Sequence, residues 1–381
     1  MSIVRGECAP RFVAVREAFE KSFAAGEEVG ASFAAYLDGE PVVDLWGGHR
    51  DAAHEQSWER DTLVNVFSTT KAMAAVSLHV LADRGKLDLD APVARYWPEF
   101  AQAGKAALPV RYLLSHRAGL AALRRRLPTE ALWDWKRMTD ALAAEAPWWE
   151  PGTANGYHAM TYGFLVGEVL RRIDGRTLGT FFRDEVAGPL DADFHIGLPA
   201  AEDARVAQMV PPSAAEMAAA GAAAQPAPGS LLAKVMGNPP LAPETANRAE
   251  WRRAEIPAAN GHGNARSVAR AMAALACGGA LGGVRLLGSE ALARATREEC
   301  HGPDLVLGVP MRWGQGFMLA SETLPLSPTG RAFGHGGWGG SLGIADPEAR
   351  LSWAYVMNKM SAGTLGDPRA FRLAQALYAG L

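Results

Sequence analysis

The first apolar positions of the chain recur at helical spacing. Four of them lie three or four residues apart, Phe12, Val15, Phe19 and Phe23. That spacing places the four side chains on one face of a helix. We therefore predict a helix over this segment.

Two short β-rich segments follow, Ser32–Leu37 and Pro41–Trp46. Between them lies Asp38-Gly39, a dipeptide that favours a tight hairpin turn. The pattern therefore predicts a two-stranded hairpin. Because an isolated hairpin is only marginally stable in water, it needs partner strands from elsewhere in the chain.

Strand character returns only near the C-terminus, since residues 68–277 have the pattern of helices and long loops. The candidate strands are Arg312–Leu319, Ala332–Gly334, Ser341–Ala345 and Leu351–Asn358. A last helix is expected from Pro368 to Leu381, with Asp367 as its N-cap. These strands are the available partners for the N-terminal hairpin.

Strands at both ends of the chain predict one discontinuous α/β domain, formed by residues 1–67 and 300–381. The intervening residues 68–299 would form a mainly helical domain, with the functional cleft between the two. Two sequential domains are the alternative. Within the insert, Pro211–Ser230 is almost entirely Ala, Pro and Gly, and we expect it to be a surface loop or lid.

Composition indicates a globular protein, because 49% of the 381 residues are hydrophobic and 21% are charged. The 38 basic and 41 acidic side chains nearly cancel. A nucleic-acid-binding protein usually carries a basic excess on one face. The strongest basic run, Arg124-Arg125-Arg126, is most simply a solvated surface, so no nucleic-acid partner is expected.

The three cysteines, Cys8, Cys277 and Cys300, are scattered and odd in number. This argues against a disulfide framework and a structural zinc site. Neither a His-Glu-x-x-His motif nor a nucleotide-binding glycine loop occurs, so we expect no metal and no cofactor. Without an export signal or a long apolar run, the chain is expected to be cytoplasmic, with no membrane segment. Its oligomeric state stays open.

The first candidate for chemistry is the Ser68-x-x-Lys71 motif. Apolar spacing predicts a helix over Lys71–Asp83, ended by Gly85. Ser68 would then open this helix, with Lys71 beside it one turn later. A serine hydroxyl needs a base before it becomes a nucleophile, and a nearby lysine can serve. The alternative is an N-capping serine followed by a solvated lysine.

The second candidate is Tyr157, at the junction between a loop and a predicted helix. Pro151-Gly152 favours a turn, and Asn155-Gly156 favours another just before the tyrosine. A phenol there can project into a cleft and transfer protons, and a neighbouring ammonium would favour its phenolate form. The alternative is an ordinary half-buried tyrosine.

The third candidate is the glycine-rich segment Phe333–Ser341. So many glycines beside β-rich sequence suggest a strand that a substrate or another backbone approaches closely. It also contains Gly-x-Ser-x-Gly around Ser341, the motif of a nucleophile elbow. That motif requires a strand before the serine and a helix after it. Because a strand and a turn follow instead, Ser341 is disfavoured as the nucleophile.

Two histidines remain outside these motifs. His116 lies in a Leu-Leu-Ser-His-Arg-Ala-Gly-Leu segment, where we expect it to stabilise a loop through hydrogen bonds. His262, in an Asn-Gly-His-Gly-Asn segment, could line a cleft.

The ordered set of Ser-x-x-Lys, tyrosine and glycine-rich strand resembles the penicillin-recognising serine hydrolases. These include class C β-lactamases, DD-peptidases and family VIII carboxylesterases. The resemblance extends to Leu113–Leu120 and Pro151–Tyr157, and it covers nearly the whole chain. It implies a β-lactamase-like α+β fold, in which helices from both termini flank an antiparallel sheet that carries a large, mainly helical insert.

The resemblance implies that Ser68 is the acylated nucleophile, that Lys71 activates it, and that Tyr157 transfers protons. Whether Tyr157 is a phenolate beside charged Lys71, or neutral beside Lys71 as the base, is left open by the sequence.

The triplet His335-Gly336-Gly337 falls where the lactamases have Lys-Thr-Gly, so the resemblance makes it a substrate-binding strand together with Trp338. The backbone N–H of Trp338 would pair with that of Ser68 to form an oxyanion hole.

Two departures from the lactamase pattern bear on the substrate. Ala159 replaces the asparagine of Tyr-x-Asn, and His335 replaces a lysine suited to a substrate carboxylate. Histidine is usually neutral at pH 7. Both changes weaken β-lactam recognition and favour a neutral ester, and the Tyr157–Gly163 segment is similar to the family VIII version.

The sequence therefore predicts a serine hydrolase that cleaves short-chain carboxylic esters of small molecules through an acyl-enzyme, with weak β-lactam hydrolysis as a side activity. The alternatives are an acyltransferase with the same acyl-serine, a β-lactamase or peptidase, and a non-catalytic binding protein on the same fold.

Overall fold

The computed structural model describes residues 3–219, 226–363 and 365–381. Within them, strands from both ends of the chain form a nine-stranded sheet in the order β1-β3-β2-β14-β13-β12-β11-β10-β9. These strands are β1 Val4–Cys8, β2 Gly30–Leu37, β3 Glu40–Gly48, β9 Cys300–Pro303, β10 Pro310–Trp313, β11 Met318–Leu319, β12 Phe333–Gly336, β13 Leu342–Asp346 and β14 Leu351–Met357. All neighbours in it are antiparallel.

The α-helices follow the expected distribution, with most of them between the two groups of strands. They are α1 Val13–Ala24, α2 Thr70–Asp83, α3 Val110–Leu114, α4 Trp135–Ala144, α5 Thr161–Asp174, α6 Leu178–Phe182, α7 Ala214–Ala219, α8 Leu231–Gly237, α9 Ala249–Arg253, α10 Ala265–Ala276, α11 Ser289–Thr296 and α12 Pro368–Tyr378. The remaining short strands are β4 Val64–Asn65, β5 Phe194–Ile196, β6 Gly261–Gly263, β7 Ala280–Leu281 and β8 Val284–Arg285.

The predicted pairing of the N-terminal hairpin with the C-terminal strands is confirmed. Strand β2 pairs with β14 over its length, from Leu37 opposite Leu351 to Ala31 opposite Met357. The hairpin turn has positive φ at both Asp38 and Gly39, the geometry that matches the twist of paired strands. The edge strands β1 and β9 were not predicted from the pattern.

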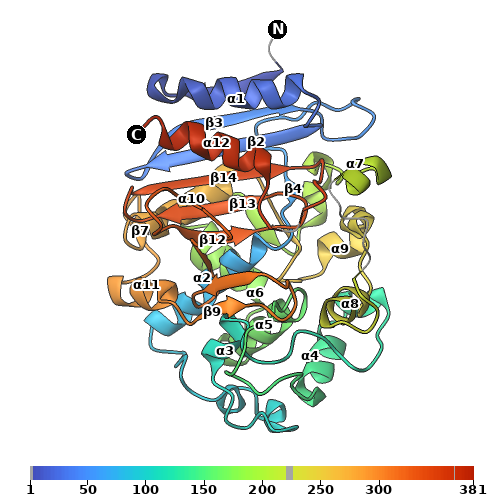
Figure 1. The fold of residues 1–381 in the computed structure, drawn as a ribbon. Helices are drawn as coiled ribbons and strands as arrows, with labels where there is room; N and C mark the ends of the chain where they lie inside the picture. The colour runs from blue at the N-terminus through green and yellow to red at the C-terminus, as the bar shows by residue number, and fades with distance from the viewer. Residues whose placement is uncertain (1–2, 220–225, 364) are drawn as a thin grey trace.

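Helices cover both faces of the sheet. Side chains alternate between faces along a strand, and β14 shows which helix covers which face. Ser352 donates a hydrogen bond to the Ala269 carbonyl of α10 at 2.8 Å, whereas the ring of Tyr355 lies under the Arg369 guanidinium of α12. Helix α1 packs against α12 on this second face. Figure 1 shows these terminal segments, in blue and red, side by side.

Helix α2 of the helical part packs against α5 and α6 and also against β12 of the large sheet. Helices α3, α4, α5 and α8 lie in the lower half of Figure 1, and α2 lies near the centre. The small sheet β4-β6-β5 lies beside the start of α2, where the backbone of Val66 donates to the Gly261 carbonyl. Apolar side chains of both parts form one continuous core.

Four predictions of secondary structure need correction. The expected strand Arg312–Leu319 is divided into β10 and β11, because residues 314–317 are not in a strand. The 211–230 segment is not all loop, because α7 lies within it; residues 220–225 fall outside the described part. Asn155-Gly156 forms no turn: Asn155 makes an extended bridge with Asp304, because tertiary hydrogen bonds override the local turn preference. The last helix ends at Tyr378 rather than Leu381.

The division into two domains at residue 299 stays a proposal. Helix α10 belongs by sequence to the insert, yet it packs against β14, β2 and β13.

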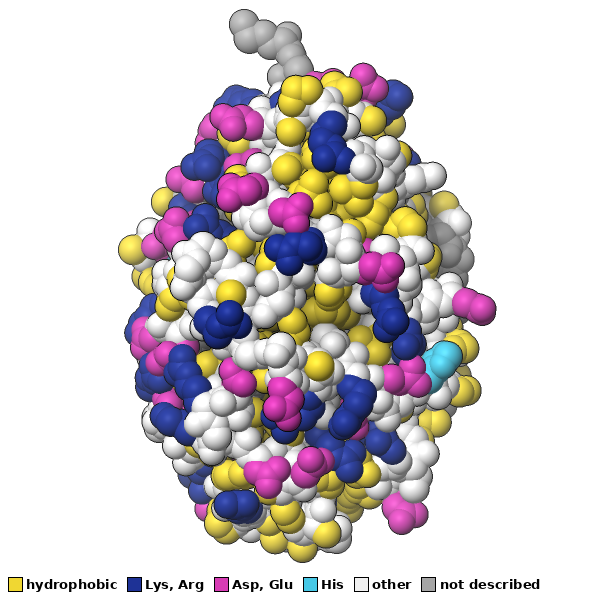
Figure 2. All heavy atoms as spheres, turned by 90° about the vertical axis from the view of Figure 1, so that its left-hand side faces the viewer, with side chains coloured by type: hydrophobic (Ala, Val, Ile, Leu, Met, Phe, Trp, Pro, Cys, Tyr) yellow, Lys and Arg dark blue, Asp and Glu magenta, His cyan; other side chains and the backbone are white. Residues whose placement is uncertain are grey.

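Charged groups of both signs are interspersed over the face shown in Figure 2 rather than gathered into a basic field. Among the described residues, no helix is both long and apolar enough to cross a bilayer. In the same residues, no cluster of histidine, cysteine and carboxylate side chains is suited to hold a metal ion.

Candidate active site

Ser68 lies in the turn that leads into α2. The helix begins at Thr70, and its N-cap position is Thr69, which makes no side-chain capping bond. Phe67, just before the serine, has a φ of 42°, an uncommon conformation for a residue with a side chain. Ser68 is half-buried while its neighbours in the turn are buried. The turn thus presents the serine hydroxyl from an otherwise closed surface, and the simple N-cap interpretation is wrong.

Lys71 is completely buried rather than solvated. Its Nζ lies 2.9 Å from Ser68 Oγ. The same nitrogen donates hydrogen bonds to the carbonyl oxygens of Ala159 at 2.8 Å and Ala258 at 2.9 Å. When the amine is neutral, these two carbonyls occupy both of its N–H groups. Its lone pair is then left facing the serine hydroxyl, as a general base requires.

The electrostatics of the site favour neutral forms of both Lys71 and Tyr157. Burial lowers the pKa of Lys71 well below its ordinary value of 10.5. Burial also raises the pKa of Tyr157, the Asp304 carboxylate raises it further, and a hydrogen bond with the Ser68 side chain lowers it. The lysine Nζ lies 4.8 Å from the centroid of the tyrosine ring. The three predicted catalytic side chains are therefore brought together.

Asp304 holds the tyrosine loop in place. Its Oδ1 accepts the backbone N–H of Tyr157 at 2.9 Å, and its Oδ2 accepts from Asn155 Nδ2 at 3.1 Å. The same Oδ1 also accepts the N–H groups of Val306 and Leu307. Asp304 was not predicted from the sequence, because Asn155 and Tyr157, the residues it holds at the site, are remote from it along the chain.

A buried pair of histidines supports the same loop. His116 Nδ1 accepts the backbone N–H of His158 at 3.1 Å, and the His116 carbonyl accepts from Gly156 at 3.0 Å. His158 Nε2 in turn accepts the Leu120 N–H. Burial lowers the pKa of His158 to about 4, so these bonds are made by neutral imidazole. The predicted loop-stabilising role of His116 is confirmed.

His335 lies on β12, beyond the two residues of this strand that pair with β11. Within the described residues, no strand pairs with β12 on that side at His335 and Gly336. His335 is buried, and its Nδ1 donates to the Gly336 carbonyl at 2.7 Å. Burial and the nearby Lys71 lower its pKa to about 3. The imidazole is thus neutral, as the sequence suggested, and offers no charge to a substrate carboxylate.

The glycine-rich turn packs closely against the serine turn. A Cβ on Gly337 would lie 2.2 Å from the Val66 carbonyl oxygen, so only glycine fits there. Ser341 Oγ donates to that same carbonyl at 2.7 Å and lies 3.0 Å from Thr69 Oγ1. Ser341 therefore fastens β13 to the start of α2 instead of standing on a strand–helix elbow.

Two backbone N–H groups near the contact between the glycine-rich turn and the serine turn are available to bind a substrate. Among the hydrogen bonds of the described residues, neither the N–H of Ser68 nor that of Trp338 has a protein acceptor. Trp338 is half-buried, with its ring 5.4 Å from that of Phe67. Unpaired N–H groups of this kind can stabilise the charge that develops on a carbonyl oxygen under attack.

His262 lines no open surface. It is fully buried in β6, opposite His195 of β5, and its Nδ1 bonds to the Asn260 carbonyl at 2.8 Å. Its neighbour Gly261 contributes to the site indirectly, because its N–H donates to Thr70 Oγ1 at 2.8 Å. The small sheet thereby supports the first residue of α2.

Comparison with known proteins agrees with this arrangement. The sequence pattern of the β-lactamase family matches residues 15–378. The chain is 38% identical to the esterase/β-lactamase LipL of Mycobacterium tuberculosis, over 94% of this chain and 83% of that protein.

Among solved structures, the chain is similar to a family VIII carboxylesterase, with 49% identity, a TM-score of 0.92, and coverage of 99% of this chain and 100% of that one. It is also similar to a penicillin-binding protein homologue from Caulobacter crescentus, with 46% identity, a TM-score of 0.91, and coverage of 99% and 100%.

Proposed function

The chain belongs to the β-lactamase family, and we propose that it is a serine esterase that hydrolyses short-chain carboxylic esters of small molecules. One observation carries this proposal. Ser68 Oγ lies 2.9 Å from the Nζ of a fully buried lysine. The two N–H groups of that lysine, when neutral, are held by carbonyl oxygens. This is a nucleophile with its base already in position.

In the proposed mechanism, Ser68 Oγ attacks the ester carbonyl while Lys71 takes its proton. The backbone N–H groups of Ser68 and Trp338 bind the oxyanion of the tetrahedral intermediate. Tyr157, hydrogen-bonded to the serine side chain, gives its proton to the departing alcohol oxygen and takes up the proton held by the Lys71 ammonium, so that both side chains are neutral again in the acyl-enzyme. The C–O bond to the alcohol then breaks and leaves an acyl-serine, which water hydrolyses by the same steps.

The surroundings of the nucleophile favour a neutral ester. A carboxylate on the substrate would find neutral His335 where a lysine could have made a charge-assisted bond, worth about 1.5–3 kcal/mol. Ala159 contributes only its carbonyl, which is already bonded to Lys71. The name of the mycobacterial relative couples esterase with β-lactamase, and it supports weak β-lactam hydrolysis as a second activity.

The test is a panel of p-nitrophenyl esters of increasing chain length, together with a chromogenic cephalosporin, assayed with wild type and Ser68→Ala. Short-chain esters are expected to be hydrolysed with the higher kcat/KM, and Ser68→Ala to be inactive. Esterase activity that survives in Ser68→Ala would refute the assigned nucleophile. A cephalosporin kcat/KM equal to that for p-nitrophenyl butyrate would refute the substrate preference.

We also propose a cytoplasmic location. In its support, Cys8, Cys277 and Cys300 are all unpaired, as is usual in a reducing compartment.

A further inference from the structure

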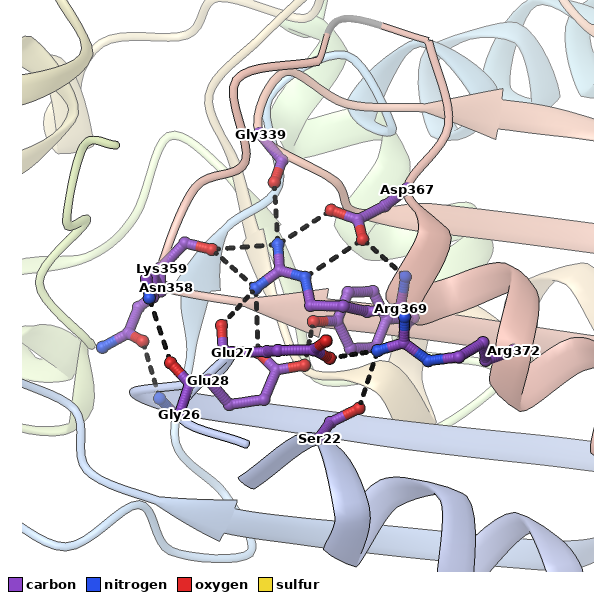
Figure 3. Close-up of polar contacts among 12 residues, drawn as sticks. Ser22, Gly26, Glu27, Glu28, Gly339, Asn358, Lys359, Asp367, Arg369 and Arg372 are labelled. Atoms are coloured by element: carbon purple, nitrogen blue, oxygen red, sulfur yellow. Dashed lines mark hydrogen bonds and ion pairs between the residues drawn. The ribbon is translucent and has the colours of Figure 1, made fainter. Parts of the chain in front are cut away.

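A buried cluster of charges lies at the start of α12, outside the chemistry described above. The Arg369 side chain is 8% exposed and lies between two carboxylates that are almost fully buried. Its Nη1 is 3.0 Å from Glu28 Oε2, and its Nη2 is 2.8 Å from Asp367 Oδ2. Tyr355 donates its hydroxyl to the other oxygen of Glu28 at 2.6 Å. Figure 3 shows the guanidinium at the centre of this cluster.

The same guanidinium binds backbone carbonyls of three separate segments. It donates to Glu27 O at 3.1 Å in the loop after α1, and to Lys359 O at 3.1 Å after β14. It also reaches Gly339 O at 3.3 Å, in the turn between β12 and β13. The planar guanidinium of arginine has five N–H donors and can bind several acceptors in a fixed geometry, whereas a lysine ammonium cannot.

The third segment directly follows Trp338, whose N–H is assigned to the oxyanion hole. The turn is closed by a bond from Gly340 N to Gly337 O at 3.1 Å. Gly339 and Gly340 have φ values of +88° and +129°, so the turn has little conformational preference of its own. A Cβ on Gly340 would lie 2.2 Å from Asp367 Oδ2. Arg369 and Asp367 therefore both contact the two residues after Trp338, and Gly339 O accepts in addition the backbone N–H of Ser361 at 2.8 Å.

Stability alone does not account for this cluster. Buried ion pairs cost much desolvation free energy, and apolar side chains of similar volume often stabilise a protein equally well. Next to an oxyanion hole, rigid polar contacts can hold the backbone N–H groups in the correct orientation before negative charge develops on the substrate oxygen.

We propose that Arg369 is a positioning residue for ester hydrolysis: together with Asp367 it holds the Gly339-Gly340 turn, and thereby keeps the Trp338 N–H aimed at the oxyanion formed on Ser68. This inference rests on the proposed esterase function. It assigns Arg369 no contact with the substrate.

The test compares Arg369→Lys with Arg372→Lys. Arg372 lies one turn further along α12, is 45% exposed and pairs with Glu27, so it is a matched control away from the turn. Complete loss of an oxyanion donor costs about 10²–10³-fold in kcat, and misalignment costs less. We expect Arg369→Lys to lower kcat for p-nitrophenyl butyrate about tenfold while KM changes by less than about twofold. Arg372→Lys should match wild type.

A second readout separates positioning from stability. Phenylboronic acid forms a tetrahedral adduct with an active serine, so its Ki should rise in parallel with the fall in kcat for Arg369→Lys only. Wild-type kcat and Ki in Arg369→Lys, at a temperature where circular dichroism shows it folded, would overturn the proposal even if its Tm is lower.

Should Arg369→Lys not fold, Asp367→Asn provides the same test, since asparagine also caps helices but loses the charge that holds the guanidinium. The same tenfold loss is expected, and wild-type kinetics would again overturn the proposal. A wild-type protein without Ser68-dependent esterase activity would instead refute the proposed function itself.

Discussion

Replacing Tyr157 with phenylalanine removes one oxygen atom from the centre of the proposed proton path. The ring remains, so its stacking on Trp313, with centroids 5.8 Å apart, is retained. The loop is still held by Asp304 through the backbone of residue 157. The lost hydrogen bond to the Ser68 side chain contributes about 1 kcal/mol to stability. We therefore expect Tyr157→Phe to fold normally, with a small change in Tm.

Catalysis should respond far more strongly. Removal of a proton-transfer group typically costs about 10²–10⁴-fold in rate, which corresponds to about 2.7–5.4 kcal/mol in the barrier. The expected result is a fall of that size in kcat for p-nitrophenyl butyrate. The assay is steady-state hydrolysis, with Tm measured on the same preparations.

Tyr162→Phe is the matched control. Tyr162 is fully buried, and its ring centroid lies 5.8 Å from Lys71 Nζ. Its hydroxyl has no hydrogen-bond partner in the described part of the chain. Its removal should leave kcat unchanged. A loss of less than about threefold in Tyr157→Phe, or equal losses in the two variants, would refute the proton-transfer role.

Three further predictions follow from the same geometry. A fluorophosphonate should label Ser68 alone, as located by peptide mass mapping; an adduct on Ser341 would contradict the assignment of that residue to a structural contact. Lys71 must be neutral to accept a proton, and burial lowers its pKa. A plot of kcat/KM against pH should therefore rise to a plateau with its midpoint well below 10.5. A midpoint at or above that value would exclude a buried lysine base. Asp304→Ala leaves three backbone N–H groups without their acceptor. It should lower the free energy of unfolding by at least about 3 kcal/mol and reduce kcat by displacing Tyr157. Wild-type stability in urea unfolding would show that Asp304 does not hold the loop.

The sequence was sufficient to predict those features that depend only on residues close together along the chain. The spacing of apolar residues predicted α1, and the Asp38-Gly39 turn predicted the β2–β3 hairpin, because periodicity and turn geometry act over a few residues. The Ser68-x-x-Lys71 spacing predicted that the two proposed catalytic side chains lie together at the start of α2, for the same reason. The order of the motifs along the chain was enough to identify the family.

Some predictions failed where distant residues decide the outcome. Asn155-Gly156 was expected to form a turn, but the carboxylate and backbone of Asp304 hold it extended. His262 was expected near a cleft and is instead buried in a small sheet formed by three segments far apart in sequence. A short motif carries no information about partners that lie more than a hundred residues away.

Most helices and strands, the candidate nucleophile and the preference for a neutral substrate could be inferred from the sequence. The protonation states of Lys71 and Tyr157 could not, because they depend on the fold. Lys71 resembles a solvated first-turn lysine in the sequence, and its proposed role as a base depends on the fold, which buries it and sets the carbonyls of Ala159 and Ala258 around its amine. Removal from water disfavours the charged form, and no local pattern encodes that burial, because it arises from the packing of segments that meet only in the folded chain.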